Sequence, residues 1–149
     1  MSNENVELVR EIYSLWSRDE SARHLIDPQL EYVNPSYAVE SGIQHSRSTL
    51  GKVRDVYPDF RVEPERFLDA GEDVVVIGVA RGTSASGLKA QWRQGYVWTV
   101  RAGRAIRFRW FNQPAEALEA VGLTDRETDG ERDAPGEGGA PGAGRRDRR

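Results

Sequence analysis

Aromatic and polar residues alternate most regularly between positions 92 and 113. The runs WRQGYVW at 92–98 and IRFRW at 106–110 each place a large side chain at nearly every second position. Alternation with a period of two is typical of a half-buried β-strand. A tight turn at Ala102-Gly103 separates the two runs. We therefore expect a hairpin of two strands whose aromatic face forms one wall of a ligand-binding pocket.

The remaining pattern predicts helices followed by a meander of strands. Apolar residues recur at i, i+3, i+4 and i+7 in the first part of the chain. The expected helical segments are a first helix at about 3–18, a short turn at 21–26, a serine-capped helix at 48–56 and a last short helix at 115–121. The expected strands are a brief one at 30–34, before a loop at 35–44, and four more at 61–68, 73–84, 89–101 and 104–112. This order indicates an α+β domain with helices covering one face of a curved antiparallel sheet.

The composition changes sharply after Leu123. Residues 124–149 consist of glycine, proline, alanine, threonine and charged residues, with no aromatic residue, leucine, isoleucine or valine. Such a segment cannot bury enough apolar surface to offset the entropy lost on ordering. We therefore expect one domain over residues 1–123 and a disordered tail over residues 124–149.

Composition and charge exclude several classes of function. A chain of 149 residues with 38% hydrophobic residues has room for one domain with a core. The net charge of -3 argues against nucleic-acid binding, which needs a concentrated basic face. The absence of cysteine excludes disulfides and thiolate metal sites and suits the cytoplasm. The chain starts without a signal-peptide pattern, and its longest apolar run, 74–80, is too short to span a membrane. We expect a cytoplasmic protein that binds neither nucleic acid nor membrane.

Aromatic and amide side chains are the expected ligand contacts. Each belongs to a predicted element that could face the cavity: the first helix, the first strand, the end of the helix at 48–56, or the hairpin. They are Tyr13, Trp16, Tyr32, Asn34, Tyr57, Trp92, Tyr96, Trp98, Trp110 and Phe111. Core packing explains this group about as well as ligand contact, because Tyr and Trp bury much apolar area yet need a partner for the O–H or N–H.

The end of the last strand leaves two alternatives open. Simple alternation places Asn112 on the face of Phe108 and Trp110, and Gln113 on the opposite face. A bulge near Trp110 would exchange the two faces. Either amide can donate and accept hydrogen bonds but cannot act as a base. Capping of the last helix explains the amides at least as well as a role in a pocket.

Four longer motifs carry a resemblance to a known family. They are ENVELVREIYSLW at 4–16, FRVEPERFLDAG at 60–71, VWTVRAG at 97–103 and AEALEAVGL at 115–123. In this order they resemble the SnoaL-like branch of the nuclear transport factor 2-like superfamily. The resemblance implies a cone, in which a bent antiparallel sheet wraps around the long first helix and a cavity opens between them, commonly in a homodimer. The superfamily includes polyketide cyclases, ketosteroid isomerases, epoxide hydrolases and binding modules, so the fold by itself does not fix a function.

The resemblance also implies where acid–base chemistry would reside. Isomerase and cyclase relatives use a carboxylate to remove a proton next to a carbonyl group. Many SnoaL-like sequences carry an acidic residue just before the last helix, at about the place of Gln113, and often a histidine at the place of Tyr96. The catalytic candidates here are therefore Tyr96, His45, Asn112 and Gln113, with His45 expected in a loop. None of the four is a carboxylate.

These observations favour a binding protein over an enzyme. We expect a small, largely apolar ligand in a cavity between the sheet and the first helix. The alternative is an isomerase, cyclase or hydrolase acting on a carbonyl-bearing or polycyclic molecule. No cofactor is expected. A metal site is not expected either, because the two histidines lack other ligands at suitable spacing.

Overall fold

A six-stranded sheet in the order β2-β1-β6-β5-β4-β3 forms the body of the protein. The computed structural model describes residues 2–123, and the predicted tail lies outside the described residues. The strands are β1 (Ile26–Asn34), β2 (Gly42–His45), β3 (Arg61–Ala70), β4 (Asp73–Thr83), β5 (Lys89–Arg101) and β6 (Arg104–Phe111). The helices are α1 (Ser2–Ser17) and α2 (Pro114–Ala120), with the 3-10 helices η1 (Arg23–Leu25) and η2 (Arg47–Asp55).

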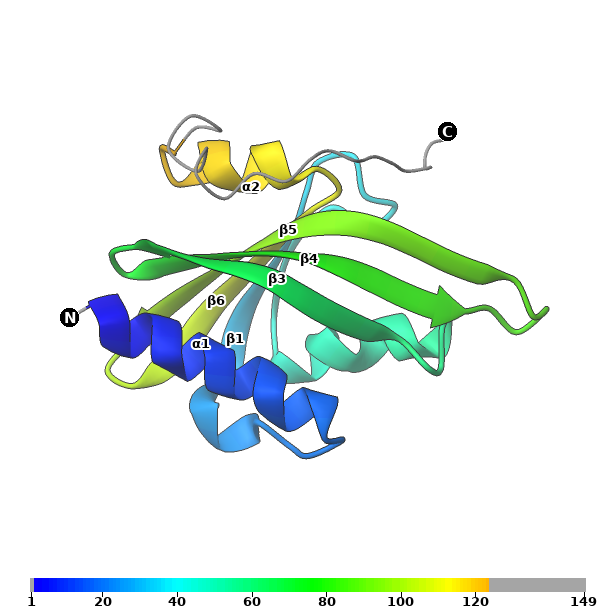
Figure 1. Ribbon diagram of the computed structural model, residues 1–149, viewed down its shortest axis with the longest axis horizontal. Coiled ribbons are helices and arrows are strands. Elements are labelled where there is room, and N and C mark those ends of the chain that lie inside the picture. The colour runs from blue at the N-terminus through cyan, green and yellow to red at the C-terminus, as the bar shows by residue number, and fades with distance from the viewer. Residues whose placement is uncertain (1, 124–149) are drawn as a thin grey trace.

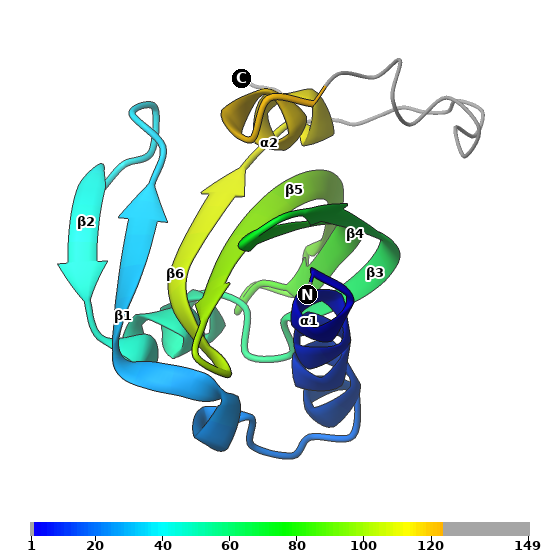
Figure 2. The ribbon, with the colours of Figure 1, turned by 90° about the vertical axis from the view of Figure 1, so that its left-hand side faces the viewer.

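The sheet curves over α1, and α2 lies on the opposite, outer side (Figures 1 and 2). Helix α1 packs against β3 and β4 through its apolar stripe, in which Val9 and Ile12 are fully buried. On the inner face of the sheet, this stripe meets Val76, Trp98 and other members of the main core. The mixed α+β architecture and the curved sheet around the first helix are confirmed.

A bulge in the last hairpin settles which residues face inward. The pairing shifts between Thr99 opposite Arg107 and Val100 opposite Ala105, so Ile106 is the extra residue. The bulge therefore lies at Ile106, not near Trp110. Beyond it, Trp98 pairs with Phe108 and Tyr96 with Trp110, as simple alternation predicts.

A smaller core fills the space between the outer face of the sheet and α2. Val75, Ile77 and Val97 contact Ala117 and Leu118 of this helix, and Phe111 packs against the same cluster. Gly95 lets the helix approach closely, because a Cβ built there would lie 2.6 Å from the Cβ of Ala117. The short helix α2 is thus held by packing rather than by its own length.

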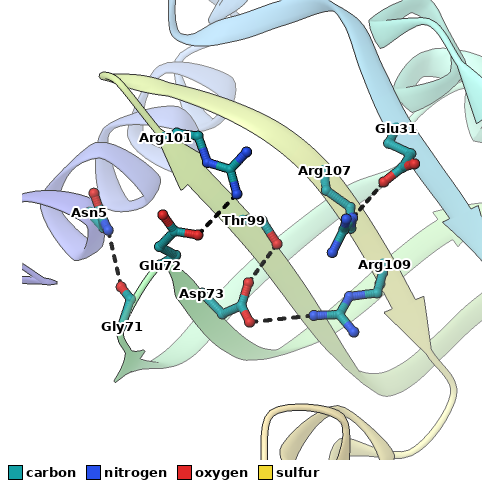
Figure 3. A network of polar contacts seen from close by, with 9 residues as sticks. All are labelled: Asn5, Glu31, Gly71, Glu72, Asp73, Thr99, Arg101, Arg107 and Arg109. Atoms are coloured by element: carbon teal, nitrogen blue, oxygen red, sulfur yellow. Dashed lines mark hydrogen bonds and ion pairs between the residues drawn. The ribbon is translucent and has the colours of Figure 1, made fainter.

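Next to α2, the outer face of β4, β5, β6 and β1 carries a polar network (Figure 3). The side chain of Asp73 accepts a hydrogen bond from Thr99 and lies 3.6 Å from the guanidinium of Arg109. Arg107 donates a hydrogen bond to Glu31 across the β1–β6 pair. These ion pairs give the outer face of this part of the sheet a polar character, in contrast to the apolar inner face.

The structure departs from the sequence-based expectation in its first half. Strand β1 begins at Ile26 and pairs with β6 in parallel, so the sheet is not purely antiparallel. This pairing is interrupted between Ile26 and Glu31, where Pro28 has no N–H to donate. The expected loop at 35–44 contains the start of β2, which pairs with β1. The helix expected at 48–56 is the 3-10 helix η2, since serine, threonine and Gly51 favour the α-helix weakly.

Candidate functional site

A pocket of about 490 Å³ opens between the end of α1, η1, η2 and the start of β3. Its apolar lining consists of buried or half-buried side chains, among them Tyr13, Trp16, Ala22, Ile26 and Leu50. Its charged lining consists of Asp19, Glu20, Arg23, Arg47, Arg54 and Arg61. Because most of the charged side chains are exposed, we describe the pocket as an apolar floor with a charged rim. We call it the mouth pocket.

Two local features shape the mouth pocket. Helix α1 ends at Ser17, and Asp19, two residues later, lies in the left-handed region at φ 59. The amide of Glu20 donates a hydrogen bond to the carbonyl of Leu15 at 2.8 Å. On the other side, Nη1 of Arg47 donates to the carbonyl oxygen of Ile26 at 3.0 Å and to that of Arg23 at 3.3 Å. The side chain of Arg47 thus ties η2 to the segment that follows α1, and the pocket lies between them.

The carboxylates of the mouth pocket lie at its solvent-exposed edge. The side chain of Asp19 is 73% exposed and lies 3.9 Å from Arg61, and that of Glu20 is 55% exposed and lies 3.2 Å from Arg18. Elsewhere in residues 4–123, the buried polar side chains are Thr49, Gln94 and Thr99, so no carboxylate or histidine is buried in that range. The described part of the chain also has no group of three residues suited to hold a metal ion.

The aromatic ladder of the last hairpin is packed core rather than a wall of the mouth pocket. Trp98 is fully buried, and its ring lies 4.6 Å from that of Phe108 and 6.0 Å from that of Tyr13 between centroids. Its indole Nε1 donates a hydrogen bond to the hydroxyl oxygen of Tyr13 at 3.0 Å. The ring of Tyr96 stacks on that of Phe108, with 5.8 Å between their centroids. Helix α1 therefore covers much of the surface that the sequence pattern suggested would be open.

A chain of hydrogen bonds runs from the core to α2. The hydroxyl of Tyr96 donates to the Oε1 of Gln94 at 2.8 Å, and the Nε2 of Gln94 donates to the Oδ1 of Asn112 at 3.1 Å. The amide of Asn112 donates to the hydroxyl of Tyr37, which donates to Glu116. Burial raises the pKa of Tyr96 well above its usual range. Tyr96 is thus a neutral hydrogen-bond donor that already has an acceptor.

Comparison with known proteins identifies the fold family. The model of the SnoaL-like domain matches residues 9–108, more than half of the chain. The chain belongs to the SnoaL-like family. No curated protein matches the sequence.

Among solved structures, a nuclear transport factor 2-like protein of unknown function from Burkholderia pseudomallei is 25% identical, with 80% of this chain and 98% of that chain covered and a TM-score of 0.62. TerC, co-crystallised with polyporic acid, is 24% identical over 79% of this chain and 98% of its own, with a TM-score of 0.63. A SnoaL-like polyketide cyclase named as putative, from Jannaschia sp., is 17% identical over 80% of this chain and 92% of that chain, with a TM-score of 0.62. The last two show a common fold only.

The four catalytic candidates do not come together in this SnoaL-like domain. Asn112 shares the hydrogen-bond chain of Tyr96, whereas Gln113 is the N-cap of α2, with its amide donating to the Oε1 of Glu116 at 3.3 Å. His45 is exposed on the edge strand β2, where its Nε2 lies 3.7 Å from the Oε2 of Glu31. The expectation of a loop at His45 was wrong, because the segment pairs with β1. Neither His45, Tyr96 nor the two amides line the mouth pocket.

Of the predicted ligand contacts, Tyr13 and Trp16 line the mouth pocket. The other predicted contacts lie outside the mouth pocket, and all but one of them belong to the inner side of the sheet. Trp98 and Tyr96 are buried in the main core, and Tyr32 packs against it. The indole of Trp110 donates a hydrogen bond to Asn34 at 2.8 Å. The rings of Tyr57 and Trp92 lie 5.5 Å apart between centroids. Phe111 is the exception: it packs against the outer cluster beneath α2, so its expected place in the cavity was wrong.

Sequence reasoning missed the contribution of η2 to the mouth pocket. Leu50 and Val53 are three residues apart, so they lie on one side of a 3-10 helix, which has three residues per turn. Arg47 and Arg54 precede and follow this pair in the same segment. All four line the pocket. The spacing was visible in the sequence, but the surface opposite η2 becomes evident only when α1 and β3 are placed beside it.

Proposed function

We propose that this SnoaL-like domain binds a small, largely apolar molecule in the mouth pocket. The observation that carries the proposal is a pocket of about 490 Å³ whose apolar lining includes three aromatic side chains, Tyr13, Trp16 and Phe60. Pockets for small molecules typically measure roughly 300–1,000 Å³ and are lined mainly by apolar and aromatic groups. An aromatic or aliphatic ring system would gain free energy by displacing water from these surfaces.

The comparison with TerC supports a ligand-binding role. TerC shares the fold over 79% of this chain and was co-crystallised with polyporic acid. At 24% identity the likeness carries the fold and not the ligand. It supports the proposal because a protein of this fold was co-crystallised with a small organic molecule.

Binding is favoured over carboxylate-based catalysis by the placement of the acidic groups. Proton abstraction next to a carbonyl needs a base held within hydrogen-bond reach of the substrate in a protected site. The carboxylates of the mouth pocket, Asp19 and Glu20, are mostly exposed and lie beside arginines. A carboxylate in this exposed position is not held in a protected site. The isomerase, cyclase or hydrolase alternative therefore has less support than ligand binding.

A fluorescence titration tests the proposal. The probe is N-phenyl-1-naphthylamine, a neutral compound whose emission rises in apolar surroundings, and quenching of Trp16 gives a second signal. Leu50→Gln places an amide on the pocket floor, and Leu88→Gln is the matched control because Leu88 is 71% exposed and outside the pocket. Losing about half the burial energy of a leucine, about 1–1.4 kcal/mol, should weaken binding about five- to tenfold in Leu50→Gln only. Absence of binding, or equal affinity in both variants, would contradict the proposal.

We also propose that the protein forms a homodimer, as the family resemblance implies. The polar outer face of β1 and β6 supports this proposal, because α2 packs against β4, β5 and β6 and leaves β1 uncovered. Light scattering coupled to size-exclusion chromatography measures the mass directly, and a monomer at micromolar concentration would contradict this proposal.

A further inference from the structure

The rim of the mouth pocket has an excess of positive charge. Four arginines and two carboxylates line the pocket. Each carboxylate lies next to an arginine, Asp19 beside Arg61 at 3.9 Å and Glu20 beside Arg18 at 3.2 Å. The guanidinium groups of Arg23, Arg47 and Arg54 line the pocket without a carboxylate partner among residues 4–123. This local excess contrasts with the net charge of -3 of the whole chain.

Arg47 is held in place by groups that do not neutralise it. Its Nη1 donates to the backbone carbonyls of Ile26 and Arg23, at 3.0 and 3.3 Å, and its side chain is half-buried. A guanidinium has five N–H donors in a fixed plane, so donors on Nη2 and Nε remain for a ligand. A fixed guanidinium loses little further side-chain entropy when it binds an oxyanion. Carbonyl oxygens hold the group in position while its full positive charge remains.

We propose that the ligand of the mouth pocket carries an anionic oxygen group, such as a carboxylate, sulfonate or enolate, on an apolar ring system. The ring system lies over Tyr13 and Trp16, and the anionic group lies at the rim. There Arg47 donates hydrogen bonds to it, and Arg23 and Arg54 add attraction. The proposal rests on the proposed binding function and narrows its ligand class from apolar molecules to amphipathic anions.

Two probes that differ by one anionic group test this assignment. The anionic probe is 1-anilinonaphthalene-8-sulfonate, and the neutral probe is N-phenyl-1-naphthylamine, which has the same rings without the sulfonate. The wild-type protein should bind the anionic probe more tightly. In Arg54→Gln and Arg23→Gln, the affinity for the anionic probe should fall about two- to fivefold each, the upper part of the range for an exposed charge contact. The affinity for the neutral probe should not change.

Further measurements distinguish a specific anion site from an effect of overall charge or of misfolding. Arg101→Gln is the matched control, because Arg101 is exposed and pairs with Glu72 on the outer face, away from the pocket. Arg47→Lys keeps the charge but loses the planar fork, and should weaken the anionic probe alone. Higher salt should weaken the anionic probe more than the neutral one. Unchanged circular dichroism and melting temperature show that each variant is folded.

The outcomes separate the two proposals. If neither probe binds, the apolar pocket itself is refuted, and with it the anion site. If both probes bind with equal affinity, or Arg54→Gln and Arg23→Gln weaken them equally, the anion assignment is overturned and the proposed binding function stands. If Arg101→Gln weakens the anionic probe as much as the rim variants do, the effect is one of overall charge and the assignment is likewise overturned.

Discussion

The clearest test of how this protein is packed compares two tryptophans whose rings lie 6.0 Å apart. Trp98 is fully buried in the core, whereas Trp16 is half-buried and lines the mouth pocket. The same substitution to alanine should therefore affect stability in one case and ligand binding in the other. Trp98→Ala removes contacts with Phe108, Tyr13 and Trp16, and the hydrogen bond to the Tyr13 hydroxyl.

The expected magnitude follows from that burial. Truncation of a buried tryptophan to alanine costs about 3–5 kcal/mol, and full burial with ring contacts on several sides places Trp98 in the upper part of this range. A domain has about 5–15 kcal/mol of stability in total, so the loss is a large share. Trp16→Ala should cost about half as much, because the side chain is already partly exposed. It should reduce the affinity for N-phenyl-1-naphthylamine, since it removes part of the pocket floor.

Urea unfolding followed by far-ultraviolet circular dichroism measures both losses without relying on the tryptophans that are removed. If Trp98→Ala proves too unstable to purify, Trp98→Phe retains most of the ring volume and isolates the lost N–H donor, at a cost of about 1 kcal/mol plus a small cavity. A loss below about 1.5 kcal/mol in Trp98→Ala, with probe affinity reduced as strongly as in Trp16→Ala, would contradict the placement of Trp98 in a packed core. It would mean that the ladder lines an open cavity after all.

Three further predictions concern α2 and two titrating groups. Gly95→Val should displace α2, because its Cβ would lie 2.6 Å from that of Ala117. Such overpacking should lower the free energy of unfolding by about 1–3 kcal/mol. An unchanged melting temperature would argue against this contact. The hydrogen bond from Arg107 lowers the pKa of Glu31 below its usual value of 4.5, so its contribution is present above pH 4.5 and is lost as pH falls through the lowered pKa. Glu31→Gln should flatten the acid limb of a stability–pH curve by less than about 1 kcal/mol, because solvent screens the pair, and identical limbs would count against the pair. Burial raises the pKa of Tyr32 from 10.0 to about 12. The contribution of this neutral phenol to stability is therefore complete below pH 10 and is lost as pH rises toward 12. In an ultraviolet titration that follows phenolate formation, Tyr32→Phe should lack one transition at high pH.

Much of the fold could be predicted from local pattern. The period-two alternation located β5 and β6, since successive residues of a strand point to opposite faces, here to the main core and to the cluster beneath α2. The apolar stripe located α1 within one residue at each end. The short β2 and the parallel pairing of β1 with β6 escaped prediction. Both depend on which strands meet, and no local propensity encodes that choice.

The candidate site was predictable only in part. Alternation correctly placed Trp98 and Phe108 on one face, but it does not say whether that face is open or covered. The answer depends on α1, whose Tyr13 reaches the indole of Trp98 and closes the space. The sequence shows that residue 112 is a neutral amide. Its hydrogen bond to Gln94 could not be predicted, because it depends on how β5 and β6 pair.

By itself, the sequence determined the order of the elements except β2, the aromatic character of the inner face and the absence of an acidic residue at the end of the last strand. These properties follow from side-chain chemistry and from periods of two and 3.6 residues, which are local. Only the tertiary structure decided the position of the mouth pocket and its arginine rim. The pocket draws on segments from Tyr13 to Val62, and these segments face one another because α1 packs under the curved sheet and Arg47 ties η2 to the chain after it.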